Sequence, residues 1–412
     1  MRETLARLVA FFTVVAIALV VAAFAWQQHS RKQQLADVLD PALWAELYPL
    51  HVAAFMEGTQ QMSGQPLDKL AANPFRQRAW AGNPFAADYT AARGHYYAQI
   101  DQQQSLRTRE FEQPAGCVYC HAAEAPGLIA QLGGETFNAQ SYDDIRDLVH
   151  HGSSCNDCHR ADDMSLQVTR PALGTALRQQ GVDIADASRQ QMRTFVCAQC
   201  HVEYYFEPET SNLVMPLAAG LTLEEIERHF DERAFSDWSH AETGAAMIKM
   251  QHPNFELHEQ GVHAAVGTTC VDCHMPVIQD GGMQVTDHSM GSPLQNVEAA
   301  CRSCHRQSDS DQILNWTQQI QRNTDAVLVE TESALDALMD ALGNIPDGRQ
   351  GSAEAVQARN AHRQAQLRWD FIDADASRGF HAPQEAIRIL TDAQRIAREA
   401  VGELSAVSEV TE

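Results

Sequence analysis

The sequence predicts a mostly α-helical protein with few or no strands, and two features of its 412 residues point to this class. No stretch shows the sustained polar–apolar alternation of a half-buried strand. From about residue 308 onward, apolar side chains recur instead at the spacing of a helix. They are Ile313, Trp316, Ile320, Val327, Leu335, Leu338 and Leu342. We therefore expect short elements before residue 308 and long helices after it.

Three helices are expected in the C-terminal region, residues 308–412. The segment 343–348, which reads GNIPDG, ends the first helix because it combines Gly, Asn and Pro. A second helix is expected near 352–376. A third begins at Pro383, a residue suited to the first turn of a helix, and runs to about residue 405. The region either caps the rest of the chain as a bundle or forms a dimer interface, and helical periodicity does not separate these alternatives.

The N-terminus carries a long apolar segment. Residues 8–26 form a segment without any charged side chain. This segment is longer than the usual core of a signal peptide and close to the roughly 20 residues that span a bilayer. Ala23, Phe24 and Ala25 nevertheless fit a signal-peptidase cleavage pattern. We favour a retained membrane anchor over a cleaved signal peptide for residues 1–27. The region 28–80 is polar and broken by prolines, which predicts short helices and loops.

Five copies of the pattern Cys-x-x-Cys-His account for all ten cysteines. The pattern is a c-type haem attachment signal, because its two thiols form thioethers to one porphyrin edge and its His reaches the iron. A single copy could equally be a zinc half-site or a redox pair, but five copies that use every Cys favour five covalently attached haem c groups. Bacteria attach haem c outside the cytoplasm, so we expect a periplasmic protein. The motifs are Cys117, Cys120 and His121; Cys155, Cys158 and His159; Cys197, Cys200 and His201; Cys270, Cys273 and His274; and Cys301, Cys304 and His305.

The formal net charge of −24 excludes some partners. A strongly acidic chain is a poor match for nucleic acid or for an anionic membrane surface. The same charge repels small anions, so an anionic substrate would need a local positive pocket inside the protein.

Histidines outside the motifs are candidates for the second axial ligand of an electron-transfer haem. The chain has 18 His, of which five lie in the motifs, so counting does not show whether one iron stays open. His95, His263, His288 and His381 each lie beside Gly or turn residues, whose backbones let a loop approach a flat porphyrin closely. His252 lies in the longest gap between motifs and is either a site residue or a surface His at the turn made by Pro253.

A calcium site is suggested next to the third motif. Carboxylate, carbonyl and amide oxygens are the ligands that hard cations prefer, and Glu203 follows His201 closely while Gln251 precedes His252. The alternative is a surface Glu beside Tyr204 and Tyr205 packed on a haem.

From about Trp80 to about Leu390 the chain resembles the pentahaem cytochrome c nitrite reductases, which are ammonia-forming periplasmic enzymes. The resemblance implies six-electron reduction of nitrite at one open-faced haem in a compact multihaem domain, residues 28–307. It also implies that residues 308–412 form a homodimer and supply one haem ligand. The segments that carry it, in the order of the family, are WAGNPF, DYTAARGHYYA, SLRT, CAQCHVEYYF, FSDW, KMQHP, CVDCHMP, TDHSMG and HAPQE.

The same resemblance assigns roles to single residues. It implies that the first haem, on Cys117 and Cys120, is catalytic, with Arg107, Tyr204 and His252 on its open face. Arg107 would supply a fixed positive charge, His252 a cation or proton donor, and Tyr204 a hydrogen bond or a proton. The implied calcium ligands are Glu203, the Tyr204 and Lys249 carbonyls and the Gln251 side chain. The implied bis-His pairs are His288 with His159, His95 with His201, His381 with His274, and His263 with His305.

One departure from the family concerns the proximal ligand of the first haem. Most members carry Lys where this chain has His121, although a smaller branch also uses His. We expect the reaction to be kept, with a different iron potential. The resemblance further implies a quinol-dehydrogenase or multihaem cytochrome as electron donor.

Three other functions stay open at this point. The chain could be a purely electron-transferring cytochrome, with His150 or His151 closing the first iron. It could reduce mainly hydroxylamine or sulfite. A membrane-tethered structural module is the weakest alternative, because the density of redox centres argues against it.

Overall fold

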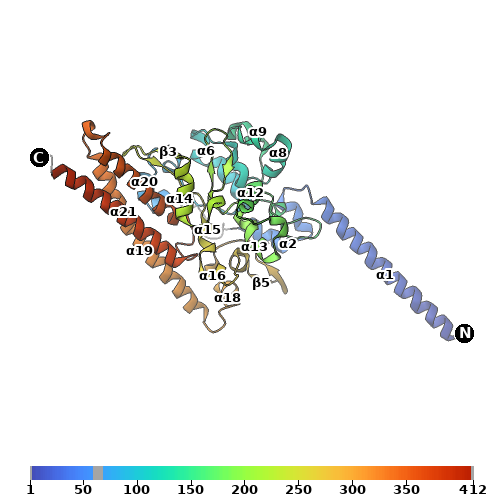
Figure 1. Cartoon of the computed structure of the whole chain (residues 1–412). Coiled ribbons are helices and arrows are strands. Elements are labelled where there is room, and N and C mark those ends of the chain that lie inside the picture. Colours follow the sequence, from blue (N-terminus) through green and yellow to red (C-terminus); the bar gives the residue numbers. More distant parts are fainter. Residues whose placement is uncertain (1, 59–67, 410–412) are drawn as a thin grey trace.

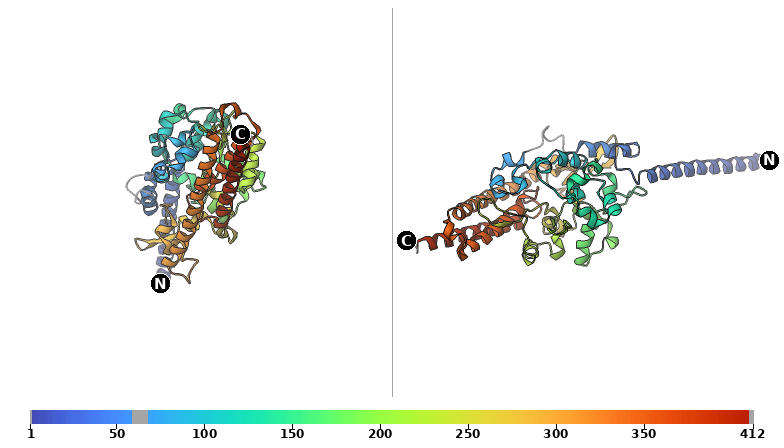
Figure 2. Two further views of the ribbon diagram at one scale, coloured as in Figure 1. Left: turned by 90° about the vertical axis from the view of Figure 1, so that its left-hand side faces the viewer. Right: turned by 90° about the horizontal axis from the view of Figure 1, so that it is seen from above.

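The computed structural model describes residues 2–58 and 68–409 of the chain (Figure 1). A body of short helices and loops carries the five motifs, and three long helices lie along one side of it. The two other views show that these long helices run side by side and that the N-terminal helix projects away from the body (Figure 2). The mostly α-helical fold class is thereby confirmed.

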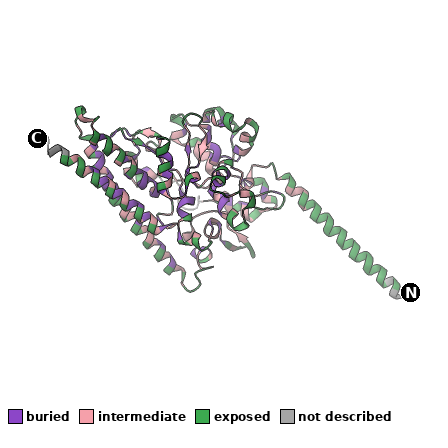
Figure 3. Ribbon diagram, in the orientation of Figure 1, coloured by how far each residue is buried: buried purple, intermediate pink, exposed green. Residues whose placement is uncertain are grey.

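Helix α1 (Arg2–Gln34) is a single rod that stands clear of the body. Its apolar side chains are exposed (Figure 3). The stretch Ala6–Gln34 is the one helix among the described residues that is long and apolar enough to cross a membrane. The helix continues past residue 28 to Gln34, where we expected loops and short helices, because no Pro or Gly occurs in this stretch of the chain.

The elements between α1 and residue 308 are short. The longest helices there have ten residues. Residues 59–67 of the expected polar region lie outside the described residues. The helices are α2 (Pro49–Glu57), α3 (Lys69–Ala72), α4 (Phe75–Ala79), α5 (Ala98–Gln104), α6 (Leu106–Glu110), α7 (Val118–His121), α8 (Ala125–Leu132), α9 (Gly134–Asn138), α10 (Tyr142–Ile145), α11 (Cys155–Cys158), α12 (Pro171–Gln179), α13 (Arg189–Ala198), α14 (Leu223–Glu232), α15 (Asn254–Glu259), α16 (Val262–Ala265), α17 (Cys270–His274) and α18 (Val297–Ala300).

Strands occur only as small antiparallel hairpins in the described part of the chain. The third hairpin turns at Gly281 and Gly282, whose φ angles of 55° and 81° suit the tight two-residue turn that matches strand twist. It aligns Val277 with Thr286 and leads directly to His288. The hairpins are β1 (Tyr205–Phe206) with β2 (Leu213–Val214), β3 (Trp238–Ser239) with β4 (Ala246–Met247), and β5 (Val277–Asp280) with β6 (Met283–Thr286).

The three expected C-terminal helices are present as α19 (Ser310–Gly343), α20 (Ala353–Asp373) and α21 (Pro383–Glu409). The Asp309 carboxylate accepts from the Gln312 N–H (2.7 Å) and caps the start of α19. The segment 343–348 ends α19, and Ser352 caps α20 by accepting from the Ala355 N–H (3.2 Å).

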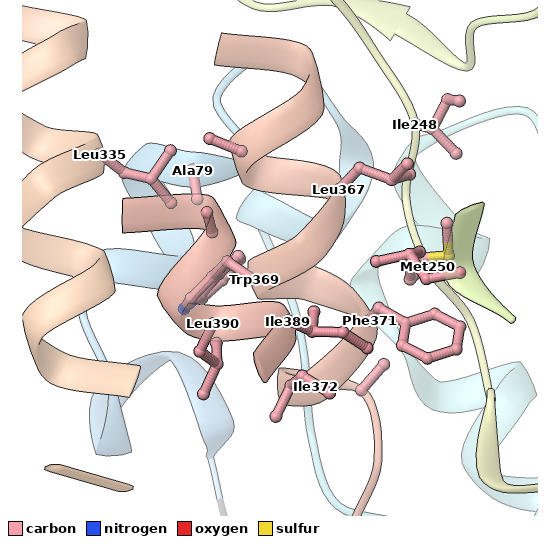
Figure 4. Close-up of a cluster of buried hydrophobic side chains, with 14 of the residues drawn as sticks. Ala79, Ile248, Met250, Leu335, Leu367, Trp369, Phe371, Ile372, Ile389 and Leu390 are labelled. Atoms are coloured by element: carbon pink, nitrogen blue, oxygen red, sulfur yellow. The ribbon is translucent and has the colours of Figure 1, made fainter. Parts of the chain in front are cut away.

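The largest apolar core lies where these helices meet the body (Figure 4). Trp369 is fully buried at its centre, between Leu335 of α19, Leu390 of α21 and Ala79 of α4. Met250, next to the expected active site, belongs to the same cluster. The core therefore crosses the expected boundary at 307/308 and ties the long helices to the loop that carries His252.

Candidate functional site

Each haem motif offers its thiols from a single helical turn or tight turn. Residues at positions i and i+3 of a turn lie on one face, so both thiols can reach the same porphyrin edge. Capping boxes hold the second and fourth turns: the Asp157 carboxylate accepts from the Ser154 N–H (2.8 Å), and that of Asp272 from the Thr269 N–H (2.8 Å). All ten cysteines are unpaired, as attachment of haem requires.

The attachment turns lie against one another. The Cys120 side chain of the first motif lies next to that of Cys200 of the third. The Cys197 side chain, also of the third motif, lies next to that of Cys270 of the fourth. Haems attached at these positions would be neighbours, as electron transfer between them requires.

Four motif histidines each lie at the spacing of a shared metal from the ring that the resemblance pairs with them. An imidazole nitrogen binds a first-row metal at about 2.0–2.1 Å, and the ring centre lies about 1 Å behind it, so two rings on opposite sides of one iron are about 6 Å apart. The observed centroid distances are 6.2 Å for His159 and His288, 5.9 Å for His95 and His201, 6.5 Å for His274 and His381, and 6.3 Å for His263 and His305. The structure thus brings together all four pairs that the resemblance implies. Two further pairs, His201 with His252 and His258 with His381, are also 6.1 Å apart, so the spacing agrees with the implied pairs without selecting them.

Backbone carbonyls orient several of these rings. A carbonyl can only accept, so a ring nitrogen beside it carries the proton and leaves Nε2 free for iron. The Nδ1 atom donates to a carbonyl in four cases: His121 to Ala98 (3.3 Å), His159 to Met164 (3.0 Å), His274 to Gly291 (3.1 Å) and His288 to Thr286 (2.7 Å).

His121 differs from the other motif histidines because no ring faces it within the described residues. His150 is exposed. The His151 Nδ1 is 2.7 Å from the Glu124 carboxylate, which holds that ring.

Arg107 and Tyr204 lie next to the first motif. Both interact electrostatically with Cys117 and with each other. Burial raises the pKa of Tyr204 well above its usual value, so the phenol keeps its proton. Strand β1, which follows Tyr204, packs tightly against the motif: a Cβ at Gly116 would lie 2.2 Å from Phe206.

The Arg107 side chain is placed to bind an anion. Its Nε is buried and has no hydrogen-bond partner, and its guanidinium stacks over the Phe85 ring at 3.9 Å. Burial lowers the pKa of Arg107, but a guanidinium stays charged near neutral pH. An unsatisfied buried donor with a positive charge would gain strongly from a bound anion.

His252 reaches the same region from the loop before α15. Burial, and the nearby His201 and His121, hold the pKa of His252 well below its usual value. The ring is therefore neutral near pH 7. The lowered pKa favours the proton-donor role expected of His252 over the cationic one, and Arg107 supplies a positive charge beside the first motif.

The expected calcium ligands converge beside Tyr204. The Glu203 side chain is fully buried and its Oε1 has no partner, while its Oε2 accepts from the Gln251 N–H (2.7 Å). The Gln251 amide lies 3.2 Å from the Lys249 carbonyl oxygen. Burial raises the pKa of Glu203 well above its usual value, which is the mark of a carboxylate that lacks a counter-ion. A cation here fits the residues present.

This site would hold its metal mainly with neutral oxygens. No three His, Cys, Asp or Glu side chains form a metal-binding group in residues 2–58 and 68–409. Carbonyl and amide oxygens with one carboxylate suit calcium and do not suit zinc or copper.

Three buried carboxylates near these residues carry no signal in the sequence. Glu256 accepts from the Glu203 N–H (3.0 Å). Asp370 of α20 accepts from the Lys249 Nζ (2.8 Å) and the Met250 N–H (3.0 Å). Asp375 accepts from the His381 Nδ1 (2.9 Å). Asp370 lies more than 100 positions from the loop that it holds, so only the fold brings it there.

Comparison with known proteins gives one consistent answer. Residues 40–411 match the family described as cytochrome c552. The cytochrome c-552 of Porphyromonas gingivalis is 37% identical over 350 residues, which cover 83% of this chain and 70% of that protein. The cytochrome c-552 of Parabacteroides distasonis is 37% identical over 333 residues, covering 79% and 67%.

A solved structure agrees with the sequence relatives. The chain is similar to the catalytic subunit of cytochrome c nitrite reductase from Desulfovibrio desulfuricans, a structure described with two calcium sites. The TM-score is 0.82 at 27% identity, and the match covers 89% of this chain and 86% of the other. This chain belongs to the cytochrome c552 family.

Proposed function

We propose that this protein is a periplasmic cytochrome c nitrite reductase that converts nitrite to ammonium at the first of five haem c groups. One observation carries the proposal: four motif histidines face a second histidine ring, whereas His121 faces none among the described residues and has the unpaired Arg107 cation nearby. The chemistry supplied by the bound haems is the delivery of six electrons to nitrite at the first iron.

Arg107 would bind and orient nitrite. Its charge offsets the repulsion that a chain of net charge −24 exerts on an anion. The guanidinium is held by the aromatic face of Phe85 (3.9 Å), so the donors are fixed before nitrite arrives. Preorganised donors of this kind stabilise the negative charge that builds on oxygen as the N–O bonds break.

His252 and Tyr204 would deliver protons. A neutral imidazole donates through one N–H and recovers a proton from solvent, and it does not repel Arg107. The phenol of Tyr204 stays protonated because its pKa is raised. It would therefore hydrogen bond to a leaving oxygen without competing as an anion.

A calcium ion would fix two of these side chains in place. Glu203, the Tyr204 and Lys249 carbonyls and the Gln251 side chain would bind it, and Tyr204 and His252 are the chain neighbours of these ligands. The ion would also neutralise the buried Glu203 carboxylate. We propose these four residues as the calcium ligands.

Substitution of Arg107 tests the assignment. We expect Arg107→Ala to lower nitrite turnover about 10²–10³-fold, the usual cost of removing one preorganised donor, with unchanged haem content. Arg109→Ala is the matched control, because Arg109 lies on the same helix and is exposed. Equal turnover in the two variants would contradict the proposal.

The spin state separates the reductase from a purely electron-transferring cytochrome. The proposal requires one high-spin haem in five in the oxidised protein, with a spectrum that changes on addition of nitrite. Five low-spin haems would leave only electron transfer. Rates on hydroxylamine and sulfite, measured on the same preparation, would rank these alternative substrates.

We also propose that residues 1–27 remain as a membrane anchor and that the electron donor is a quinol-dehydrogenase or multihaem cytochrome at the membrane. The second haem motif is tied to the end of α1. The Asn156 Nδ2 lies 3.1, 3.0 and 3.0 Å from the carbonyl oxygens of Leu35, Ala36 and Val38. An anchored α1 would hold the second haem close to the bilayer. Recovery of the mature protein in the soluble fraction, with an N-terminus after Ala25, would contradict this.

We propose that the long C-terminal helices form a homodimer. We also propose that the chain is divided into an N-terminal segment (1–27), a haem domain (28–307) and a C-terminal helical region (308–412). Trp316 and Val329 of α19 are 51% and 58% exposed, and a second copy of the chain packed on α19 would cover such side chains. Trp316→Glu should give monomers in size-exclusion chromatography if α19 forms the interface.

A further inference from the structure

Asp375 lies in the loop between α20 and α21, against a haem ligand contributed by the C-terminal region. Its side chain is buried, with 1% exposed, and its Oδ1 is 2.9 Å from the His381 Nδ1. The four carbonyl-bound rings described above meet a neutral acceptor. The His381 ring is hydrogen bonded to a carboxylate instead.

The hydrogen bonds around Asp375 show that it is ionised. Oδ1 accepts from His381 Nδ1, from the Asn254 Nδ2 (2.7 Å) and from the Ser377 N–H (3.4 Å), and Oδ2 accepts from the Ser377 hydroxyl. Every one of these partners is a donor. A carboxylate accepts on both oxygens, whereas a carboxylic acid would need an acceptor for its own proton.

The same carboxylate connects two haem positions. Asn254 donates to Asp375 and is also hydrogen bonded to the ring of His201, the motif ligand of the third haem. His381 is the partner of His274 in the fourth pair. The path His381–Asp375–Asn254–His201 therefore runs through hydrogen bonds from the fourth pair to the third.

The loop is built to hold this geometry. A Cβ at Gly261 would lie 2.0 Å from the His381 carbonyl oxygen, so the segment before α16 packs directly on the loop. The Ser377 hydroxyl, besides donating to Asp375, accepts from the His381 N–H (3.0 Å). These contacts fix Asp375 and His381 relative to each other.

We propose that Asp375 is a positioning residue that lowers the reduction potential of the fourth haem. A carboxylate on Nδ1–H makes the imidazole a stronger electron donor than a carbonyl does. A stronger donor stabilises the ferric iron more than the ferrous iron, so the potential falls. A lower potential at this position would favour electron transfer towards the third haem, whose motif ligand His201 lies beside Asn254.

This inference depends on the haems and not on the reaction. It could fail while nitrite reduction is correct, and the reverse also holds. The readout is therefore a reduction potential, measured without nitrite.

The test compares two substitutions in the haem-loaded protein. Asp375→Asn keeps the shape and the hydrogen bond to Nδ1 but removes the charge. We expect one of the four low-spin components in an EPR-monitored redox titration to move to higher potential, with the other three unmoved. Asp373→Asn is the matched control: it removes the same charge two positions away, from a buried carboxylate that binds Arg76 (2.7 Å) instead of a haem ligand. It should leave all four components in place.

A second variant keeps the inference testable if Asp375→Asn does not load haem. Ser377→Ala removes one donor from the same carboxylate and leaves its charge, so Asp375 becomes a stronger acceptor for His381. The expected shift is therefore to lower potential. The inference is overturned if a fully loaded Asp375→Asn variant keeps all potentials, if Asp373→Asn gives the same shift, or if Ser377→Ala shifts no component downward.

Discussion

The three long C-terminal helices and the motif-bearing body are built in opposite ways. The helices have 34, 21 and 27 residues and share a continuous apolar core around Trp369. The body, from residue 35 to about 308, has no helix longer than ten residues in its described part. It contributes residues such as Trp80 and Phe230 to the large core, and its other apolar clusters are smaller. The helices can bury their apolar faces against each other. The body needs five porphyrins to supply the rest of its interior.

Polar side chains replace apolar packing in the body. The fully buried Arg170 donates to the carbonyls of Tyr119 and Ala122 in and after the first motif, and to the Asp157 carboxylate of the second (2.5, 2.9 and 2.5 Å). Gln199 of the third motif accepts from the Arg170 N–H (3.2 Å). The buried Arg170 thus holds three attachment turns together. In the C-terminal helices, the shared apolar core has this role.

The largest effect predicted from this contrast is that of removing the haems. In a chain expressed without haem attachment, we expect α19, α20 and α21 to keep their helical structure, while the body exchanges its amide protons as an unfolded chain does. Hydrogen exchange followed by mass spectrometry measures both regions in one sample. Equal protection of the two regions would show that the body folds without its cofactors.

The contrast also explains what could be predicted from the sequence. The bounds of the long helices followed from local signals, namely the periodicity of Leu335, Leu338 and Leu342 and the break at 343–348. The motif residues followed from covalent chemistry that needs fixed spacing. The resemblance supplied the axial pairs, because a pair such as His95 and His201 is separated by a hundred positions and no local pattern links its members.

Other features of the site could not be predicted because they depend on the fold alone. Asp370, Asp375 and Glu256 are ordinary acidic residues in the sequence, and only burial and convergence give them a role. The neutral state of His252 is a second example, because the ionisation of a side chain depends on its burial and on neighbours that lie far away in the chain.

Removing the hydrogen bonds that join Arg170 to the three attachment turns should have the next largest effect on stability. Arg170→Met removes one partner of a buried ion pair and leaves Asp157 uncompensated, so we expect a loss of about 3–5 kcal/mol in the free energy of unfolding. Guanidinium denaturation followed at the haem absorbance measures it. Arg170→Met with Asp157→Leu should recover much of the loss, because the unpaired charge is gone. A loss below about 1 kcal/mol in the single variant would show that haem attachment alone holds the turns.

Acid should weaken the junction between the two regions. His362 of α20 is fully buried, and its Nδ1 and Nε2 lie 3.0 Å from the Thr243 hydroxyl and 3.0 Å from the Gln366 amide oxygen. Burial, with His240 and Arg78 nearby, lowers the pKa of His362 to about 3. The unfolded chain binds this proton below about pH 6.5 and the folded chain does not, so stability falls as the pH drops from about 6.5 towards 3.

The role of His362 is tested by comparing the stability of the protein at two pH values. Between pH 7 and pH 5 this single group should cost about 2 kcal/mol. His362→Gln has no such proton, so its thermal midpoint should fall less than that of the native protein over the same interval. Parallel falls in the two proteins would mean that other groups set the acid sensitivity.

The smallest predicted effect concerns the ion pairs at the surface of the same junction. Arg78 of α4 binds Asp336 and Asp340 of α19 (2.8 and 2.6 Å) and Glu242 between β3 and β4 (2.9 Å). These side chains are 29–65% exposed, so water and salt screen the pairs and we expect Arg78→Ala to cost about 1 kcal/mol or less. The difference from the native protein should shrink further in 1 M salt. A loss of several kcal/mol that survives high salt would mean that charge, together with the apolar core around Trp369, holds the long helices to the body.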